Sequence, residues 1–386
     1  MREHGYLGSA AGSIPFGHLG WGYRDRAEFL RHTAAYIADG LRRNQRITYV
    51  AEASGDALRA ELTAMSRIDE RLDWGDVEMT PATEYYQSRP GDVIDAEPAV
   101  ARCVAAAERA IDDGYSGLRA VVDVTPMART PEQRDALARL EYLVDQEMAA
   151  RPYARLCGYN TGQLSSAAAE LVCLHPFVGT GSVPFRIFAD PDAGVHFALT
   201  GEIDAASNDL FTTTLQRIWP LTTDHSLRID ASSLEFIGHQ QLGMLEESAR
   251  EQNRKVVLCT NQRTAVRLVD LLNLSNVRVE APPAYPTGVT EVARLRQELR
   301  QREEQLESQP AIEQVKGMLM QIFGLDAQDA FALLSCLSQD TNTKLKDVAA
   351  RIRDELTDHA PADARQAALD ALTTLRDRLR APRSSE

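Results

Sequence analysis

The sequence predicts a multidomain chain: a largely parallel α/β domain, a compact α/β sandwich, a short coiled coil and an all-α bundle of three helices. Three observations support this prediction. The 386 residues, 44% of them apolar, exceed what one ordinary hydrophobic core holds. Strand-like and helix-like runs alternate as far as residue 280. Between residues 310 and 356, apolar residues recur only at helical spacing.

The chain is acidic, with a formal net charge of −14 that repels nucleic acid at long range. Any contact with RNA therefore requires a local basic patch. No apolar run approaches the ~18 residues that span a bilayer, and residues 1–14 lack the basic start and apolar stretch of a secretory signal. We therefore expect a cytoplasmic protein without membrane partners, whose five scattered cysteines are buried thiols rather than disulfides.

The first domain is predicted to cover residues 1–178, with a turn-rich loop at Gly17–Asp25 ahead of its first helix. Strands alternate with helices after that loop, which favours a largely parallel sheet. The expected elements are helix Asp25–Arg42, strand Arg46–Ala51, strand Leu118–Val124, helix Pro131–Ala149, strand Ala154–Tyr159 and strand Glu170–Leu174.

The order of loop, helix and strand resembles the RecA-like fold of nucleotide-binding proteins. The loop has no GK[ST] motif, so the lysine and hydroxyl that would hold phosphate and Mg²⁺ are missing. We therefore predict no ATP hydrolysis. Asp123 ends the run RAVVDV, where a RecA-like ATPase would keep its metal-holding carboxylate, and we expect it to be a vestigial or structural acid.

The loop carries His18, Trp21 and Tyr23, and two later segments read LCGYN (156–160) and CLHP (173–176). Together these motifs resemble the MEDS domain, a sensory domain related to RecA-like ATPases. The resemblance implies a small organic ligand of unknown identity and no other cofactor. The candidate ligand-binding residues are His18, Trp21, Tyr23, Cys157, Tyr159 and His175. The alternative is that the histidines are structural and that the aromatic residues belong to the core or its rim.

A metal site is chemically conceivable in the same region, because imidazole and thiolate groups suit zinc or copper. The donors would be His18, Cys157, Cys173 and His175. They do not follow a spacing that is characteristic of a metal site, so the sequence predicts no metal.

The second domain is predicted to cover residues 184–280, after a flexible junction, GTGSVP. Its segments GEIDAASNDLF, LRIDASSLEFIG and RLVDLLNL resemble a STAS domain, the fold of anti-sigma factor antagonists. The expected elements are the strands in FRIFAD and HFALTGEID, helix Ala206–Ile218, strand Ser226–Asp230, helix Gln240–Glu251, strand Val256–Cys259 and helix Ala265–Leu272.

Phosphorylatable members of that family carry Asp, then Ser-Ser or Ser-Thr, then Gly-Leu at the turn into the helix after the middle strand. Here Gly238, His239, Gln240 and Gln241 occupy the place, and none supplies a hydroxyl. The resemblance therefore implies a degenerate phosphorylation site and a relay that docks an anti-sigma factor or kinase. His239 is expected to be an exposed polar cap of the helix.

Residues 281–309 are predicted to form a proline-rich linker and a coiled coil of about two heptads. The seam would consist of Val292, Leu295, Leu299 and Leu306, with Arg302 in the remaining position. Such a seam would make the protein a homodimer. The tail, residues 357–386, offers one more amphipathic helix at Ala362–Leu379.

Residues 310–356 contain three apolar stripes that predict three short helices. Gly324 is expected to end the first helix, Asp326 to cap the second, and Asn342 or Thr343 to cap the third. The stripes are Ile312, Val315, Leu319 and Ile322; Ala330, Leu333, Leu334 and Leu337; and Leu345, Val348, Ala349 and Ile352.

The runs IEQVKGMLM, DAFALL and SQDTNTKLKDVA in this region resemble an ANTAR domain, the RNA-binding output module of bacterial transcription antiterminators. The resemblance implies recognition of paired RNA stem-loops. The candidate RNA-binding residues are Lys316, Gly317, Asn342, Lys344, Lys346 and Arg351. The chain departs from the family pattern at Gln309, Val315, Ser335, Cys336 and Leu337, where basic side chains are lost or the usual alanine is replaced.

The sequence therefore predicts a signal-responsive regulator that senses a small molecule, relays the signal and binds RNA to control transcription antitermination. The alternative is a protein-interaction switch that resembles an anti-sigma factor antagonist and whose terminal bundle only dimerises. We do not expect an enzyme, because no nucleophile, base and orienting acid recur at a recognisable spacing.

Overall fold

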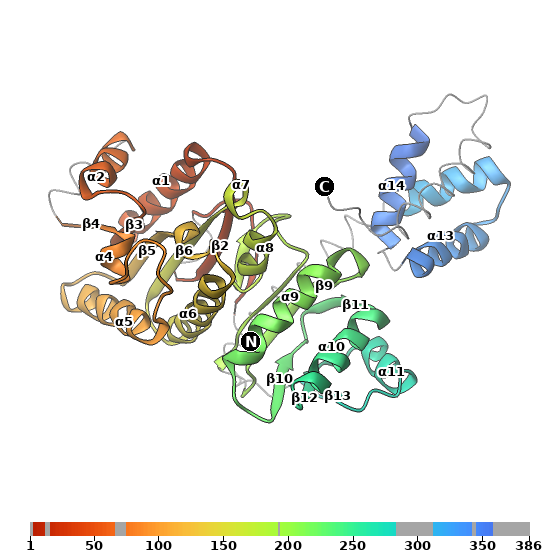
Figure 1. Ribbon diagram of the computed structural model, residues 1–386. Coiled ribbons are helices and arrows are strands. Elements are labelled where there is room, and N and C mark those ends of the chain that lie inside the picture. Colours follow the sequence, from red (N-terminus) through yellow and green to blue (C-terminus); the bar gives the residue numbers. More distant parts are fainter. Residues whose placement is uncertain are drawn as a thin grey trace. The chain divides into compact units, whose positions relative to one another are not determined.

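A seven-stranded parallel sheet forms the first part of the protein (Figure 1). The computed structural model describes residues 3–11, 16–65, 75–191, 194–282, 312–341 and 345–357. The strand order is β1-β7-β2-β6-β5-β3-β4. The strands are β1 Gly5–Leu7, β2 His18–Tyr23, β3 Arg46–Ala51, β4 Val77–Pro81, β5 Leu118–Asp123, β6 Tyr153–Asn160 and β7 Phe177–Gly179.

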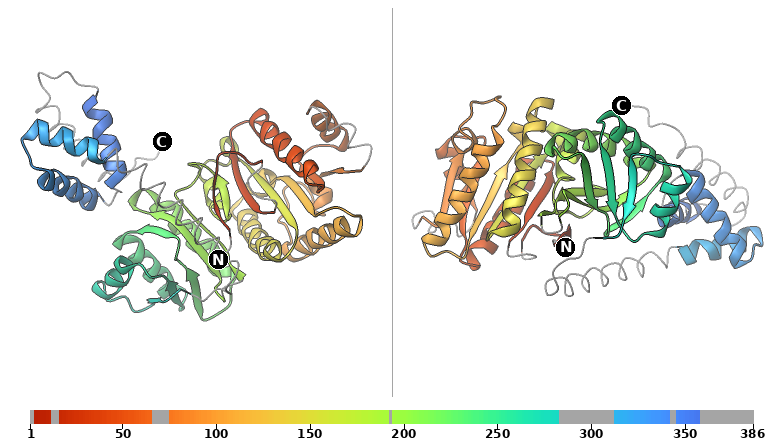
Figure 2. Two further views of the ribbon diagram at one scale, coloured as in Figure 1. Left: turned by 180° about the vertical axis from the view of Figure 1, so that it is seen from behind. Right: turned by 90° about the horizontal axis from the view of Figure 1, so that it is seen from below.

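Helices cover both faces of this sheet, as expected for parallel strands. Figures 1 and 2 show α1 on one face and α5 and α6 on the other. The helices are α1 Arg26–Arg42, α2 Gly55–Ala64, α4 Ala82–Tyr85, α5 Ala96–Asp112, α6 Pro131–Ala150, α7 Thr161–Leu164 and α8 Ser166–Val172. The predicted parallel α/β fold is therefore confirmed for this part of the chain.

Local sequence explains where helices α1 and α6 begin. Asp25 caps α1 by accepting a hydrogen bond from the backbone N–H of Glu28. Thr130 and Gln133 form a capping box at the start of α6, and Pro131 occupies the first turn, where its missing N–H costs nothing.

Two predictions of secondary structure in this domain are wrong. Residues 18–23 form strand β2, which lies inside the sheet between β7 and β6, instead of a loop. Their glycines hide the strand, because glycine weakens every strand pattern. The predicted strand Glu170–Leu174 lies mostly in helix α8, whose SAAAELV sequence is rich in good helix formers. A short apolar run fits either element, and the true strand is β7, a few residues later.

A second sheet follows, with strand order β11-β9-β10-β12-β13 and β8 antiparallel to β9. Its strands are β8 Phe185–Ala189, β9 Phe197–Ile203, β10 Ser226–Asp230, β11 Leu234–Ile237, β12 Lys255–Cys259 and β13 Val277–Glu280. Its helices are α9 Asn208–Ile218, α10 His239–Glu251 and α11 Arg263–Leu271. Every strand and helix predicted for this region is present, and β11 and β13 are additional.

The chain divides into two compact units. One takes in Met1–Glu202 and Asp209–Tyr285, and so holds the two sheets. The other takes in Ile203–Asn208 and Pro286–Glu386. The predicted coiled coil and the C-terminal tail helix lie outside the described residues. Within the described parts of the chain, no helix has both the length and the apolar character to cross a membrane.

The C-terminal bundle contains helical residues 312–323, α13 Ala327–Thr341 and α14 Leu345–Thr357. All twelve residues of the predicted apolar stripes belong to one hydrophobic cluster or pack against it. Gly324 adopts a φ of 68° after the first helix, a conformation that glycine reaches without strain. The Asp326 carboxylate accepts hydrogen bonds from the backbone N–H groups of Gln328 and Asp329. The predicted helices and these two termini are confirmed, while the predicted cap at Asn342 or Thr343 lies outside the described residues.

Candidate functional site

The alternation of side chains along β2 places the candidate ligand residues on two faces of the sheet. Leu19, Trp21 and Tyr23 join the hydrophobic core that includes Phe29 of α1. His18 points to the opposite face, toward α6, where it contacts Glu141 and Asp145. A strand has a side-chain period of two, so residues 18 and 21 cannot share a face. The six candidate residues therefore do not form one site.

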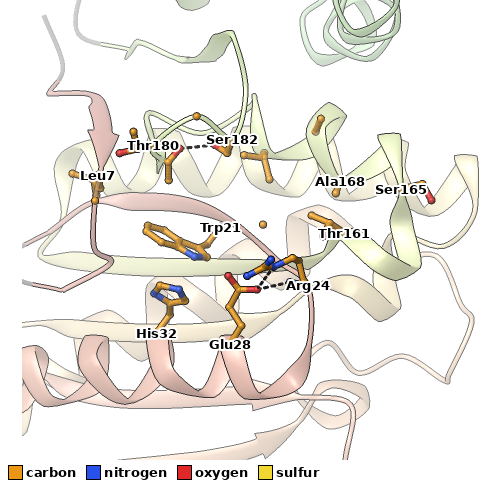
Figure 3. Close-up of a pocket in the computed structure, with 16 residues that line it drawn as sticks. Leu7, Trp21, Arg24, Glu28, His32, Thr161, Ser165, Ala168, Thr180 and Ser182 are labelled. Atoms are coloured by element: carbon orange, nitrogen blue, oxygen red, sulfur yellow. Dashed lines mark hydrogen bonds and ion pairs between the residues drawn. The ribbon is translucent and has the colours of Figure 1, made fainter. Parts of the chain in front are cut away.

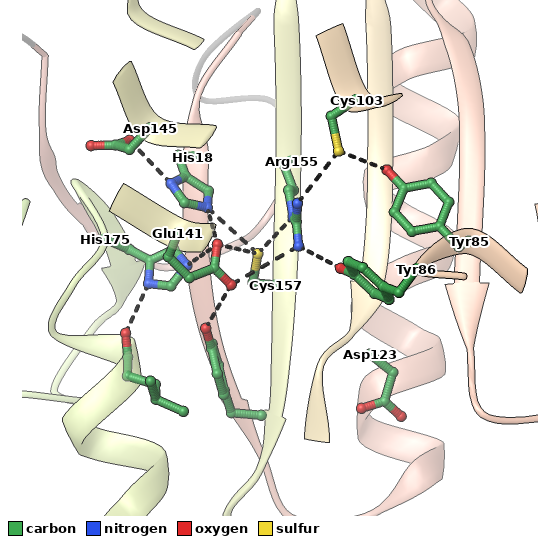
Figure 4. Close-up of polar contacts among 12 residues, drawn as sticks. His18, Tyr85, Tyr86, Cys103, Asp123, Glu141, Asp145, Arg155, Cys157 and His175 are labelled. Carbon is green, nitrogen blue, oxygen red and sulfur yellow. Dashed lines mark hydrogen bonds and ion pairs between the residues drawn. The ribbon is translucent and has the colours of Figure 1, made fainter. Parts of the chain in front are cut away.

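A buried polar cluster lies on the α6 face of the sheet (Figure 4). We define the cluster as His18 of β2, Glu141 and Asp145 of α6, Cys157 of β6, and His175 in the turn after α8, each 0% exposed. His18 donates from Nδ1 to Asp145 Oδ1 and from Nε2 to Glu141 Oε2, both at 3.0 Å. The Cys157 Sγ atom lies 3.5 Å from His18 Nε2 and 3.5 Å from Glu141 Oε2.

Two more side chains surround this cluster. The fully buried Arg155 donates from Nε to Cys157 Sγ at 3.1 Å and from a terminal nitrogen to the Tyr86 hydroxyl at 2.8 Å. The Tyr159 hydroxyl donates to Glu141 Oε1 at 3.1 Å. The cluster therefore contains several charged groups within the protein interior, and each must be compensated there.

Burial and partners move the pKa values of the two histidines in opposite directions. Burial alone would lower the pKa of His18, but hydrogen bonds to Asp145, Cys157 and Glu141 raise it well above 6.5. Burial and the neighbouring His18 cation lower the pKa of His175 to about 3. Burial would raise the pKa of Glu141, but Arg155 and His18 lower it well below its usual range. At neutral pH the cluster thus pairs an imidazolium with carboxylates beside a neutral imidazole.

Tyr23 belongs to a separate network at the carboxyl end of β2 and β5. Its hydroxyl donates to Asp123 Oδ2 at 3.0 Å, and Arg26 also donates to that oxygen at 3.0 Å. Arg26 further pairs with Glu61, whose carboxylate accepts a hydrogen bond from the Tyr49 hydroxyl. Asp123 is therefore engaged by an arginine and a tyrosine of its own domain, which agrees with a structural acid.

Trp21 lines an open pocket of about 420 Å³ at the carboxyl ends of β1, β2 and β7 (Figure 3). Glu28 and His32 of α1 form one wall, and Ser165 and Ala168 contribute to the opposite wall. The Trp21 and His32 rings lie 4.7 Å apart between centroids. Ligands of parallel α/β sheets bind at the carboxyl ends of the strands. Position, size and mixed lining make this pocket the candidate site for a small organic molecule.

The polar groups of the pocket have defined charges. A hydrogen bond from the Arg24 backbone N–H, together with the Arg24 side chain, lowers the pKa of Glu28. Burial lowers the pKa of His32. At neutral pH the wall therefore presents a carboxylate and a neutral imidazole beside an indole.

The sequence pattern misses the two α6 carboxylates, Glu141 and Asp145. Their only signal is a spacing of four residues on the buried face of an amphipathic helix, which is too common to single them out. Cys173, a conceivable metal donor by sequence, lies elsewhere and contacts Thr214 with its Sγ at 3.4 Å. The prediction that all cysteines are buried is also wrong, because Cys336 on α13 is exposed.

Of the candidate RNA-binding residues, Lys316, Gly317 and Arg351 can be placed. Lys316 donates to both carboxylate oxygens of Glu313, and its side chain is only 16% exposed. Its ammonium lies 5.9 Å from the ring centroid of Phe331, an aromatic residue that is 45% exposed. Gly317 and Arg351 are exposed. The other candidates cannot be compared: Asn342 and Lys344 lie outside the described residues, as does the side chain of Lys346.

At the degenerate phosphorylation site, Gly238 is the N-cap of α10 and makes no side-chain capping hydrogen bond. His239 and Gln240 are exposed, and Gln241 is buried. The expectation that His239 caps the helix is therefore wrong, because His239 is already the first helical residue and the preceding glycine occupies the cap position.

Comparison with known proteins relates two segments of the chain to families. Residues 17–176 match the MEDS family, described as the methanogen/methylotroph, DcmR sensory domain. Residues 300–352 match the ANTAR domain. No curated protein matches the chain closely.

One solved structure that matches is titled "Structure of an RNA-binding Light-Oxygen-Voltage Receptor". It is 31% identical over 24% of this chain and 24% of its own, with a TM-score of 0.19, so the chain spans about a quarter of that receptor. The MEDS match spans strands β2 to β6 of the parallel sheet, and the ANTAR match spans most of the described C-terminal bundle. The protein therefore combines a MEDS sensory domain with an ANTAR domain in one chain.

Proposed function

We propose that this protein is a signal-responsive regulator that binds paired RNA stem-loops through its ANTAR domain and so controls transcription antitermination. The observation that carries the proposal is the ANTAR match over residues 300–352, whose described part folds into a helical bundle with a closed apolar core. The MEDS domain supplies the sensor, and the second sheet acts as a STAS-like relay without a phosphorylatable hydroxyl.

The pocket at Trp21 and His32 is the proposed sensor site. Its volume of about 420 Å³ suits a small organic molecule, and its indole and alanine surfaces would bind the apolar part of the ligand. The carboxylate of Glu28 and the neutral His32 would orient a polar group on the same ligand. We propose an organic molecule rather than a nucleotide, because the chain lacks the lysine and hydroxyl that would hold phosphate and Mg²⁺.

Helix α8 supports a relay from this pocket to the second sheet. Ala168 and Val172 of α8 line the pocket. Glu170, between them, accepts hydrogen bonds from Arg217 of α9, and the backbone N–H of Ile187 in β8 donates to Cys173 O at 2.7 Å. A ligand that shifts α8 would therefore act directly on residues of the second sheet.

We expect RNA to contact exposed side chains of the bundle. Arg351 is an exposed cation, and Phe331 is an exposed aromatic ring near the Lys316 ammonium. Single-stranded bases of RNA loops stack on aromatic rings, while basic side chains neutralise the phosphates. Because Lys316 is already paired with Glu313, we expect Arg351 to contribute more to phosphate binding than Lys316.

The test is the salt dependence of binding to a two-stem-loop RNA. Each of Arg351→Ala, Lys344→Ala and Lys346→Ala should weaken binding and lower the slope of log K against log salt by about 0.7–0.9. Lys255→Ala is the matched control, because Lys255 belongs to β12 of the second sheet. Failure of the parent protein to bind such RNA at moderate salt would reject the antitermination function.

One observation favours the alternative, a protein-interaction switch. Leu271 at the end of α11 is 79% exposed, and the next residue, Leu272, is also exposed. Exposed apolar residues on a STAS-like domain would suit docking of an anti-sigma factor or kinase. If the parent protein bound no RNA, and Leu271→Asp abolished capture of such a partner, this alternative would replace the first.

A further inference from the structure

The buried polar cluster contains more acceptors than the described donors satisfy. His175 donates from Nδ1 to Leu171 O at 3.0 Å, which leaves a lone pair on Nε2. That Nε2 atom is buried and has no hydrogen-bond partner among the residues that the structure describes. It faces the Glu141 carboxylate, another acceptor, with 3.8 Å between Nε2 and Oε2. Two buried acceptors that face each other are unfavourable unless a cation or a hydrogen-bond donor lies between them.

Four residues that can bind a metal converge at this point: His18, Glu141, Cys157 and His175. One ligand atom from each lies within 4.8 Å of those of the other three. A tetrahedral zinc ion has bonds of about 2.0–2.1 Å to nitrogen or oxygen and about 2.3 Å to sulfur, so its ligand atoms lie roughly 3.3–3.6 Å apart. Both distances from Cys157 Sγ, to His18 Nε2 and to Glu141 Oε2, are 3.5 Å. The Glu141 distances to the two histidines, 3.0 Å and 3.8 Å, bracket the range.

Each of these four side chains also forms a hydrogen bond with a residue outside the group of four. Asp145 accepts from His18 Nδ1 and Leu171 O accepts from His175 Nδ1, so both Nε2 atoms face the centre of the site. His175 Nε2 has no hydrogen-bond partner among the described residues, and His18 Nε2 would bind a metal once the proton that it donates to Glu141 is displaced. Tyr159 donates to the other oxygen of Glu141, and Arg155 donates to the sulfur of Cys157. Metal-binding histidines usually donate their second N–H to a carboxylate or a backbone carbonyl in this way.

The charges of the cluster suit a divalent cation. On binding a metal, Cys157 would lose the thiol proton that it now donates to Glu141. The two carboxylates and the thiolate would then carry three negative charges, and Arg155 one positive charge. A divalent cation bound by the thiolate and the two neutral imidazoles would bring the sum to zero. Neutrality matters here because every member is fully buried.

We propose that His18, Glu141, Cys157 and His175 form a closed tetrahedral site for a zinc-class divalent cation. Nitrogen, sulfur and carboxylate ligands are those that zinc accepts, and four protein ligands describe a structural site rather than a catalytic one. The ion joins β2, α6, β6 and the turn after α8. It thereby fixes the end of α8, the helix that lines the sensor pocket.

The test uses the full-length protein prepared without metal and then titrated with Zn²⁺ or Co²⁺. We expect one equivalent to bind, a higher Tm, and a thiolate-to-cobalt charge-transfer band. Cys157→Ser should remove the band and the rise in Tm. Cys259→Ser is the matched control, because Cys259 is also a buried strand cysteine and lies in β12.

A milder variant keeps the test valid if Cys157→Ser does not fold. Asp145→Asn leaves all four ligands in place and weakens the hydrogen bond that orients His18 through Nδ1, so it should raise the Kd for Zn²⁺ by about 10–100-fold. A folded parent protein that binds no stoichiometric Zn²⁺ or Co²⁺ would overturn the proposal. So would a Cys157→Ser protein whose cobalt spectrum equals that of the parent.

Discussion

Arg217 of α9 connects the two sheets of the first unit through ion pairs with Glu170 and Asp135. Replacing Arg217 tests how much these ion pairs contribute to the stability of the unit. Its guanidinium lies 2.6 Å from Glu170 of α8 and 2.5 Å from Asp135 of α6. The Arg217 side chain is 7% exposed and that of Glu170 is 15% exposed, whereas that of Asp135 is 68% exposed. The pair with Glu170 should therefore contribute most of the stability, since exposed pairs are worth about 0–1 kcal/mol.

Arg217→Met keeps an apolar stem of similar length and removes the charge. Breaking a buried ion pair typically costs about 3–5 kcal/mol, because the remaining charge is left unpaired. Glu170 retains a second partner, Arg134, at 3.7 Å, and it is not completely buried. We therefore expect a lower free energy of unfolding by about 1–3 kcal/mol, the range for a hydrogen bond to a charged group.

The assay is urea unfolding of the full-length protein, followed by the fluorescence of its three tryptophans, one of which, Trp219, lies two residues beyond Arg217. Asp135→Asn is the matched control and should change the free energy of unfolding by less than about 1 kcal/mol. If Arg217→Met were no more destabilising than Asp135→Asn, the contact would not stabilise the unit, and α8 would lose its proposed role in the relay.

Two further predictions concern the second sheet and the bundle. Burial alone would raise the pKa of Glu246, but hydrogen bonds from the backbone N–H groups of Asn276 and Ser275 lower it, so the unfolded chain binds more protons in acid. The stabilisation is present above pH 4.5 and is lost as the pH falls through the lowered pKa. Glu246→Gln should flatten this dependence of stability on acid pH, measured by denaturation curves at several pH values. An unchanged dependence would contradict the assignment. In the bundle, Leu334→Ala should cost about 2–5 kcal/mol of stability because Leu334 is fully buried. Phe331→Ala should cost far less stability but lower RNA affinity by about 1–3 kcal/mol; equal thermal shifts for the two variants would show that the apolar stripe is misplaced.

The bundle shows how much a local pattern can predict. Helical periodicity placed Val315, Leu334 and Val348 in a single core without knowledge of the three-dimensional structure, because a helix face is defined by residues three and four apart. The pattern predicts the burial of Leu345 less well: this residue belongs to the stripe but is only half-buried. Leu345 is the first residue of α14, so one side of its side chain is exposed. The apolar pattern does not show where the helix begins, so it could not predict this exposure.

The buried cluster could not be predicted in the same way, because its members come from four separate elements. His18, Cys157 and His175 attract notice as residue types, but only the sheet order brings β2 beside β6, and only the packing of α6 adds Glu141. The motif reading therefore joined Trp21 and Tyr23 to His18, although the strand period separates them.

One of the two glycines that hide β2 from a pattern search, Gly20, also gives the cluster its space. Gly20 lies on the same face of β2 as His18, which precedes it by two residues. A Cβ at position 20 would lie 2.8 Å from the His175 ring, which is closer than Cβ atoms approach a neighbour, and 3.1 Å from Val172 O, which is a tight contact. Any larger residue would push His175 away from Glu141. The glycine weakens the strand pattern because the strand must leave room for an imidazole, so the failed strand prediction and the convergence of donors at His175 have one physical cause.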